Sequence, residues 1–212
     1  MSLAAASFQG GLLLGDADRR AVHLDHFKQR LDLCQRLGIP VLVLAPGFAG
    51  KIDIGSFGPA MKNLTEAARW AAGFGVKLAV EFNGTDDFFN NLDTTLTMTG
   101  QCGEPNLGVC LDAYHYHKGP SKTEDLSRLT NENLIHVQLC DVADFPREWM
   151  TDSDRILPGD GDFHLTPIAD RLRAIGYTGA VSLELMNPML WAVDAVQVCE
   201  AGLRALERFV LA

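Results

Sequence analysis

Short apolar runs alternate with longer amphipathic stretches along the chain. Residues 40–46 form an apolar run bounded by prolines, as expected for a strand that is buried on both faces. In the preceding stretch, residues 24–37, Phe27 and Leu31 fall on one helical face, and Gly38 follows where a helix commonly ends. The same alternation predicts strands at 76–82, 107–112, 134–140 and 180–185, and helices at 64–74, 88–99, 123–129, 165–175 and 193–211.

Strands separated by helices indicate an α/β fold with a parallel sheet, because parallel neighbours need a long crossover connection. A sixth strand is predicted within residues 7–14, and no segment has the composition of a linker, so residues 1–212 are interpreted as a single domain. An open doubly wound sheet usually carries a glycine-rich phosphate turn after its first strand, and this sequence has none. A (β/α)8 barrel usually takes about 250 residues, so a chain of 212 residues is short by about one or two βα units. The pattern alone leaves both architectures open.

The charge balance of the chain is acidic. It has 18 Lys and Arg against 27 Asp and Glu, a formal net charge of −9, which disfavours a nucleic-acid partner because phosphate backbones are repelled. No apolar run reaches the roughly 18–20 residues of a membrane helix, and the sequence does not open with a basic-then-apolar signal peptide. Five scattered cysteines without a C-x-x-C pair are typical of reduced thiols. We therefore expect a cytoplasmic protein that binds neither nucleic acid nor membranes.

Residues able to bind a metal stand at or near the ends of predicted strands, namely Glu81, Asp112, Gln138 and Glu184. In a parallel barrel the carboxyl ends of all strands face one mouth, so these oxygen ligands would converge and would suit Mg2+ or Mn2+ better than zinc or copper. Each acid taken alone is better explained as a helix cap or an ion-pair partner, and it is the set that favours a metal site. His136 alternates with Gln138, which predicts a buried histidine one layer below.

Two further polar residues are expected near the same mouth. His115 follows Asp112 by three residues and could donate to a substrate hydroxyl or a ligand, with an exposed loop histidine as the alternative. Arg155 precedes a tight loop and could bind a substrate oxygen, or it could pair with Asp152 or Asp154. Aromatic residues in the loops after strands could wall a pocket of sugar size, although core packing is the commoner use of an aromatic side chain; these residues are Tyr114, Tyr116, Phe145, Trp149 and Trp191.

Five motifs around these residues form a recognisable set. They are Ala-Val-Glu-Phe at 79–82, Leu-Asp-Ala-Tyr-His-Tyr-His at 111–117, Asp-Phe-Pro at 144–146, Thr-Asp-Ser-Asp-Arg-Ile-Leu-Pro-Gly-Asp-Gly at 151–161 and Ser-Leu-Glu-Leu-Met-Asn-Pro at 182–188. In combination they resemble the xylose isomerase-like TIM barrels, a superfamily of sugar isomerases and epimerases, and within it the inosose isomerase-like proteins.

The resemblance implies roles for the residues named above. The four strand-end side chains would hold a divalent metal, Mn2+ or Mg2+, with Zn2+ or Co2+ as the alternatives. Glu81 and Glu184 would move the substrate proton, and His115 and Arg155 would hold substrate oxygens. The chain aligns from about the third strand of the family barrel, so we expect a TIM barrel that lacks the first two βα units. Such a barrel exposes two strand edges, which makes a homo-oligomer plausible.

The sequence departs from the family pattern at two positions. Many members, including the inosose isomerase-like ones, have histidine where this chain has Gln138, while others have glutamine. Dehydratase relatives have a histidine where this chain has Asn83. The first departure leaves the substrate open, and the second lowers the expectation of a dehydratase.

Three functions follow from these observations. The first is a metal-dependent sugar or keto-polyol isomerase or epimerase that transfers a proton through an enediolate of a small-molecule substrate. The second is a metal-dependent dehydratase of a cyclic polyol or keto acid. The third is a non-catalytic fragment that binds a metal or a sugar.

Overall fold

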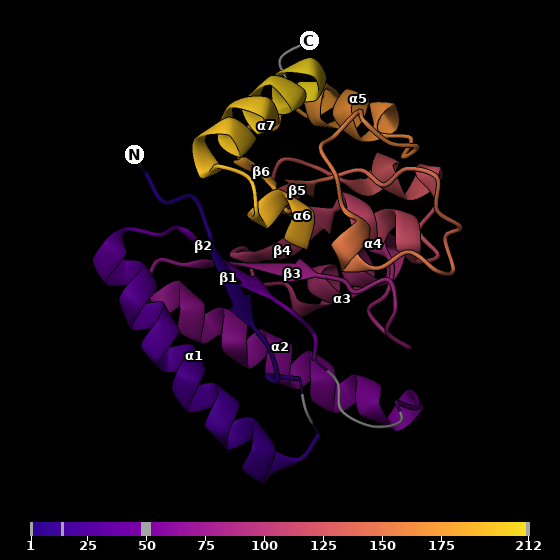
Figure 1. The fold of residues 1–212 in the computed structure, drawn as a ribbon. Coiled ribbons are helices and arrows are strands. Elements are labelled where there is room, and N and C mark those ends of the chain that lie inside the picture. The colour runs from indigo at the N-terminus through magenta and orange to yellow at the C-terminus, as the bar shows by residue number, and fades with distance from the viewer. Residues whose placement is uncertain (1, 14, 48–51, 211–212) are drawn as a thin grey trace.

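A six-stranded parallel sheet forms the centre of the molecule. The computed structural model describes residues 2–13, 15–47 and 52–210 (Figure 1). The strands lie side by side in the order β1-β2-β3-β4-β5-β6, and every neighbouring pair is parallel. A sheet whose spatial order equals its chain order is part of a barrel wall, whereas a doubly wound sheet reverses direction at a switch point. The strands are β1 (Ala6–Gln9), β2 (Val41–Leu44), β3 (Lys77–Glu81), β4 (Leu107–Asp112), β5 (Leu134–Leu139) and β6 (Val181–Leu183).

Helices connect the strands and cover the outer side of the curved sheet. Figure 1 shows α1 and α2 below the first strands and α5 and α7 above the last ones. The helices are α1 (Ala17–Leu37), α2 (Ile54–Gly73), α3 (Leu92–Cys102), α4 (Ala113–Lys118), α5 (Thr166–Ala174), α6 (Pro188–Trp191) and α7 (Ala195–Val210), with 3-10 turns η1 (Thr123–Arg128) and η2 (Asp152–Asp154).

Side-chain caps explain where two helices begin earlier than the apolar pattern predicts. The Asp53 carboxylate accepts hydrogen bonds from the backbone of Gly55 at 2.9 Å and Ser56 at 3.2 Å, so α2 starts ten residues before the predicted position 64. Asp16 caps α1 in the same way. At the other end of α1, Gly38 adopts φ 66°, a left-handed conformation that favours glycine and ends the helix as predicted.

Other elements differ from the sequence-based prediction in length or type. Residues 113–118 form α4, which was not predicted, and residues 123–128 form a 3-10 turn in place of an α-helix. The predicted strand at 180–185 is shorter, so Glu184 directly follows β6 and does not lie within it. The predicted closing helix at 193–211 corresponds to α7, which starts at Ala195, and the short helix α6 before it was not predicted. Positions 14 and 211, the ends of two predicted elements, lie outside the described residues.

Apolar side chains pack on both sides of the sheet, and those on the outer side hold the helices. Phe27 and Leu31 of α1 are fully buried and belong to the same cluster as Leu42 and Leu44 of β2. Burying a side chain of this size contributes about 1.5–3 kcal/mol to folding. On the inner side of the sheet, a smaller cluster of Val41, Val43, Ala79, Cys110 and Ile135 fills the barrel below its mouth.

Within the described part of the chain, β1 and β6 are the two edges of the sheet. Two sheet edges do not by themselves establish pairing with a second copy of the chain, so the expected homo-oligomer stays a prediction. No helix among the described residues is both long and apolar enough to span a bilayer.

Candidate metal centre

The register of the strands brings the predicted ligands together. Asp112 at the end of β4 lies opposite Gln138 of β5, and Glu81 ends the neighbouring strand β3. Glu184 directly follows β6. One carboxylate oxygen from each of Glu81, Asp112 and Glu184 lies within 4.8 Å of the others. The sequence thus predicted correctly which acids converge at the carboxyl ends of the strands.

A cavity of about 790 Å³ opens above this cluster. Its polar lining includes Glu81, His115, Gln138, Arg155 and Glu184. The predicted aromatic wall is absent among the described lining residues, and the only ring-bearing hydrophobic side chain there is that of Phe8 in β1. The aromatic prediction was wrong because the loop rings are used elsewhere: the Tyr114 ring is buried and its hydroxyl donates to a backbone carbonyl, while Trp149 and Trp191 are largely exposed.

Asp112 is fully buried, and both of its carboxylate oxygens have partners. Oδ1 accepts a hydrogen bond from the backbone N–H of His115 at 2.8 Å, which caps α4, and Oδ2 pairs with Nη1 of Arg155 at 2.7 Å. The helix cap and the ion pair that were alternatives to a metal ligand are therefore both present at Asp112. A carboxylate offers about four lone-pair positions, so these two contacts leave room for a cation.

Negative charge is incompletely balanced at the cluster. Burial, followed by the charges of Asp112 and Glu184, raises the pKa of Glu81 well above its usual range. Burial and the charge of Asp112 raise the pKa of Glu184 to about 7. Arg155 acts in the opposite direction on both glutamates but does not outweigh these effects. A divalent cation would remove the same repulsion, because it favours the ionised form of every carboxylate around it.

The amide of Gln138 is buried beside the carboxylates. Its Oε1 accepts a hydrogen bond from the Cys110 thiol at 2.9 Å. Below it, His136 is 4% exposed and its Nε2 lies 3.0 Å from the Ser182 hydroxyl oxygen. The expectation that His136 is a buried histidine one layer below the mouth is confirmed.

His115 lies in α4 and lines the cavity, not in an exposed loop. The backbone N–H of Gly84 donates to Nδ1 at 3.4 Å, so a neutral ring carries its hydrogen on Nε2. Burial lowers the pKa of His115, which favours this neutral form. Nε2 lies 3.7 Å from Oε1 of Glu81. His115 can therefore donate a hydrogen bond to a substrate oxygen next to Glu81.

Arg155 is 1% exposed and joins two carboxylates. In addition to its pair with Asp112, its Nη2 lies 2.7 Å from Oδ1 of Asp152. Its guanidinium carbon lies 4.5 Å from the centre of the Tyr114 ring. The ion pair with Asp152 was weighed from the sequence, but the stacking on Tyr114 was missed because it depends on how α4 folds back. The predicted contact of Arg155 with substrate oxygens stays a prediction.

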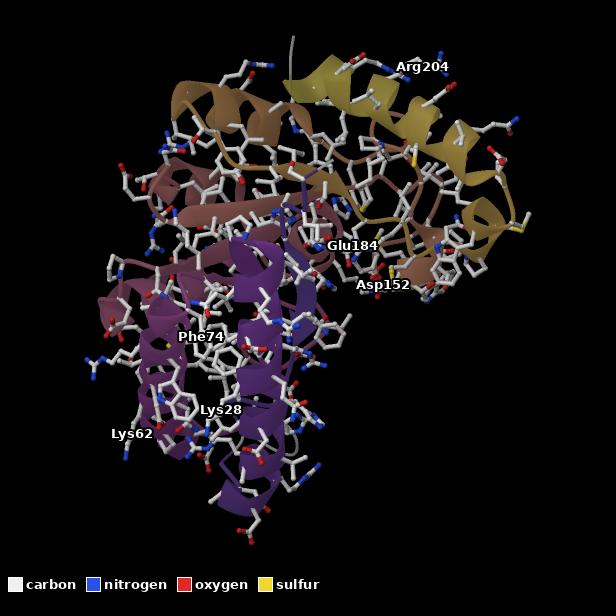
Figure 2. All side chains as sticks on the ribbon, turned by 90° about the vertical axis from the view of Figure 1, so that its left-hand side faces the viewer. Lys28, Lys62, Phe74, Asp152, Glu184 and Arg204 are labelled. Carbon is white, nitrogen blue, oxygen red and sulfur yellow. The ribbon has the colours of Figure 1, made fainter. Side chains whose placement is uncertain are left out.

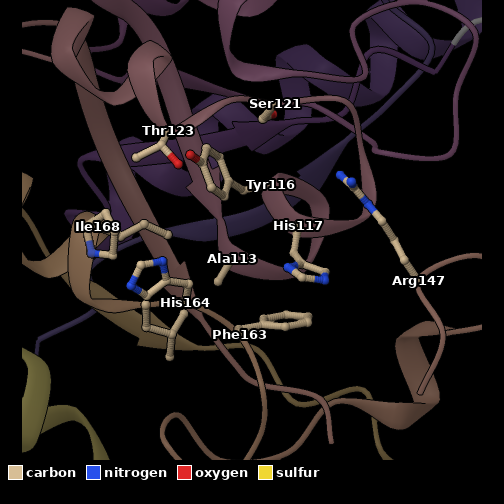
Figure 3. A pocket seen from close by; sticks show the side chains of 11 residues that line it. Ala113, Tyr116, His117, Ser121, Thr123, Arg147, Phe163, His164 and Ile168 are labelled. Carbon is tan, nitrogen blue, oxygen red and sulfur yellow. The ribbon is translucent and has the colours of Figure 1, made fainter. Parts of the chain in front are cut away.

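A second, smaller cavity lies away from the carboxylates, between α4 and the start of α5. Figure 3 shows His117 over the ring of Phe163, with Arg147 to one side. Its volume is about 180 Å³, and the Arg147 side chain donates to the carbonyl oxygens of Lys118 and Gly119. No Asp or Glu is among its described lining residues, so it is distinct from the candidate metal centre.

The family profile for the xylose isomerase-like TIM barrel matches residues 2–208. The chain belongs to this family. The predicted resemblance and the TIM-barrel fold are thus confirmed, and the described strands form six neighbouring strands of the barrel wall.

Relatives of known name are similar over most of the chain. An inosose isomerase of Halalkalibacterium halodurans is 31% identical over 84% of this chain and 64% of its own length. A 3-dehydroshikimate dehydratase of Pseudomonas aeruginosa is 26% identical over 89% of this chain and 30% of its own length. The solved structure of the IolI protein with a zinc atom superimposes with a TM-score of 0.92 at 25% identity, covering 99% of this chain and 76% of that one. This xylose isomerase-like chain thus spans less than two thirds of the length of the inosose isomerase.

Proposed function

We propose that the chain is a divalent-metal-dependent isomerase or epimerase of a sugar or keto-polyol. The observation that carries the proposal is the convergence of Glu81, Asp112 and Glu184 within 4.8 Å at the floor of a cavity large enough for a sugar. The similarity to inosose isomerases over most of the chain supports the same reaction class.

The donor set fits a hard divalent cation. Glu81, Asp112 and Glu184 offer carboxylate oxygens, and Gln138 offers an amide oxygen. Oxygen donors of this kind suit Mn2+ or Mg2+, while the zinc atom in the IolI structure supports zinc as an alternative. Burial, followed by the charges of neighbouring carboxylates, raises the pKa of both glutamates, and a bound cation would favour their ionised forms.

Each side chain of the site has its own role in the proposed reaction. When bound, the metal supplies electrophilic stabilisation of negative charge on substrate oxygens. One of the two glutamates removes the proton from the carbon beside the carbonyl, and the other returns a proton to the same or the neighbouring carbon. The pKa of Glu184, at about 7, describes the metal-free protein, and a bound cation would lower it toward the ionised form that a general base needs. His115 donates from Nε2 to a substrate oxygen and thereby fixes the orientation of the substrate.

The charges of the cavity favour an uncharged substrate over a keto acid. Among the described residues that line it, Arg155 is the only arginine or lysine, and it is already paired with Asp112 and Asp152. A substrate carboxylate would therefore have the metal, and no unpaired arginine or lysine of this lining, as its cationic partner. The Asn83 side-chain oxygen accepts hydrogen bonds from Thr85, within its own turn. These features support isomerisation of a neutral polyol ahead of dehydration of an acid such as 3-dehydroshikimate.

Hydrogen exchange with solvent tests the proposal. The Mn2+-loaded protein is incubated with an inosose in D2O, and the sugar is analysed by mass spectrometry. Isomerisation is expected to add deuterium at the carbon next to the carbonyl, and Glu184→Gln is expected to slow this exchange by about a hundredfold or more while keeping the fold.

Three other outcomes would decide against the proposal. Loss of water from the sugar would establish a dehydratase. Exchange that is as fast in Glu184→Gln as in the unchanged protein would remove Glu184 from the reaction. A protein that binds no metal and exchanges no hydrogen would be the non-catalytic fragment.

A further inference from the structure

Asp152 lies at the rim of the cavity, in the η2 turn between β5 and α5. Figure 2 labels it together with Glu184, on the same side of the molecule and far from Lys28 and Lys62 of α1 and α2. Its side chain is 52% exposed, yet Oδ1 accepts a hydrogen bond from Nε of Arg155 at 2.9 Å and lies 2.7 Å from Nη2. One edge of the guanidinium is thus held by a residue outside the carboxylate cluster.

The opposite edge of the same guanidinium reaches the cluster itself. Nη1 of Arg155 lies 2.7 Å from Oδ2 of Asp112 and 3.4 Å from the backbone carbonyl oxygen of Glu184. The face of the group stacks on Tyr114. A single buried cation is therefore shared between a proposed metal ligand, Asp112, and a carboxylate at the rim, Asp152.

We propose that Asp152 is a positioning residue for the metal centre: it holds Arg155 between two carboxylates and so limits the competition of Arg155 with a divalent ion for Asp112. This inference rests on the proposed function, since it assumes that Asp112 is a metal ligand. Asp152, at the rim of the cavity, would then affect the affinity for the metal without being a metal ligand itself.

The sign of the effect follows from the charges. Without the Asp152 carboxylate, the positive charge of Arg155 is left to Asp112 alone, and the electron pairs of Asp112 become less available to a second cation. This effect predicts weaker metal binding when Asp152 is neutral. An ordinary exposed ion pair would instead leave metal binding unchanged.

The neighbouring Asp154 provides a matched control. It lies in the same turn, and its Oδ2 accepts hydrogen bonds from the backbone N–H of Thr151 at 2.7 Å and from its hydroxyl at 2.9 Å. Asp154→Asn removes the same charge as Asp152→Asn without touching the described contacts of Arg155. Asp152→Glu keeps a carboxylate at this position and tests whether a carboxylate is sufficient for full metal affinity.

The experiment measures the dissociation constant of Mn2+ by calorimetry at pH 8, where protons compete least for the glutamates, for the unchanged protein and the three variants. We expect Asp152→Asn to bind Mn2+ about tenfold more weakly, as is typical when a residue that supports a metal ligand is lost. Asp154→Asn should stay within about twofold, and Asp152→Glu should recover most of the affinity. Circular dichroism of each metal-free variant checks that the fold is kept.

Each outcome is decisive. Unchanged affinity in Asp152→Asn, or an equal loss in Asp154→Asn, would overturn the role of Asp152 while leaving the metal site intact. If Asp152→Asn fails to fold, Asp152→Ser, which also removes the charge, takes its place, and unchanged affinity in that variant would overturn the role of Asp152. A failure of the unchanged protein to bind Mn2+ would overturn both this inference and the proposed function.

Discussion

Two adjacent layers of side chains inside the barrel differ sharply in charge. We call Glu81, Asp112, Gln138 and Glu184 the carboxylate layer. The histidine layer consists of the residues two positions earlier in the chain, Ala79, Cys110, His136 and Ser182. Because side chains alternate along a strand, both layers point to the same side of the sheet.

The histidine layer is polar but electrically neutral. Burial lowers the pKa of His136 and raises that of the Cys110 thiol well above its usual range, so neither carries charge near neutral pH. Ser182 donates to the carbonyl oxygen of Val137 at 3.3 Å and lies next to Nε2 of His136. The carboxylate layer has three acids and one amide, and the guanidinium of Arg155 beside it pairs with Asp112. The comparison teaches that an excess of charge, and not polarity as such, distinguishes a site from a well-packed interior.

The largest effect is expected when one negative charge of the carboxylate layer is removed. Glu81→Gln should weaken Mn2+ binding by about a hundredfold, since loss of one partner from a buried ionic cluster typically costs about 3 kcal/mol or more. Isothermal calorimetry measures the change. His136→Asn, a matched substitution in the histidine layer, should stay within about threefold, and an equal loss there would show that the two layers are not functionally distinct.

Sequence periodicity was sufficient to place this layer, because strand ends in a parallel barrel share one mouth. It also predicted the buried position of His136. It could not predict that Arg155 is buried between two aspartates, because that contact joins segments far apart in sequence. The helix α4 was missed because its apolar pattern is too short to show it and its start depends on the Asp112 carboxylate, which caps it.

A change of pH should alter the affinity of the carboxylate layer for Mn2+ by about tenfold. Metal must displace a proton from Glu184, whose pKa is about 7, so Mn2+ affinity should rise about tenfold between pH 6 and pH 8. The stability of the metal-free protein should change with pH in the opposite direction. The folded state binds more protons than the unfolded chain between about pH 4.5 and 7, so the free energy of unfolding falls as pH rises through this window.

Calorimetry and thermal unfolding at several pH values measure both trends. Glu184→Gln is the control, because the contribution of this carboxyl to either slope should disappear. Metal affinity that does not depend on pH in the unchanged protein would argue against protonated glutamates in the cluster.

A smaller effect is expected from the histidine layer. Ser182→Ala removes the hydroxyl beside Nε2 of His136 and should cost about 1–2 kcal/mol of unfolding free energy, because a buried donor loses its acceptor. Chemical denaturation measures this cost. The affinity for Mn2+ should not change, and a large loss of metal binding would place Ser182 in the site itself.

The smallest effect is expected where the two layers touch. Cys110→Ala removes the thiol that donates to Gln138 Oε1, and a few-fold loss of Mn2+ affinity is expected because the amide becomes less well oriented. Cys110→Ser keeps a donor and should bind Mn2+ like the unchanged protein. If the alanine and serine variants are identical, the thiol does not orient the amide.

The most direct test of the account is a crystal grown with Mn2+ and measured for anomalous scattering. The account predicts one strong peak among the side-chain oxygens of Glu81, Asp112, Gln138 and Glu184, at coordination distances of about 2.0–2.3 Å. A peak elsewhere in the protein with none among these four residues, or no peak at saturating Mn2+, would contradict it.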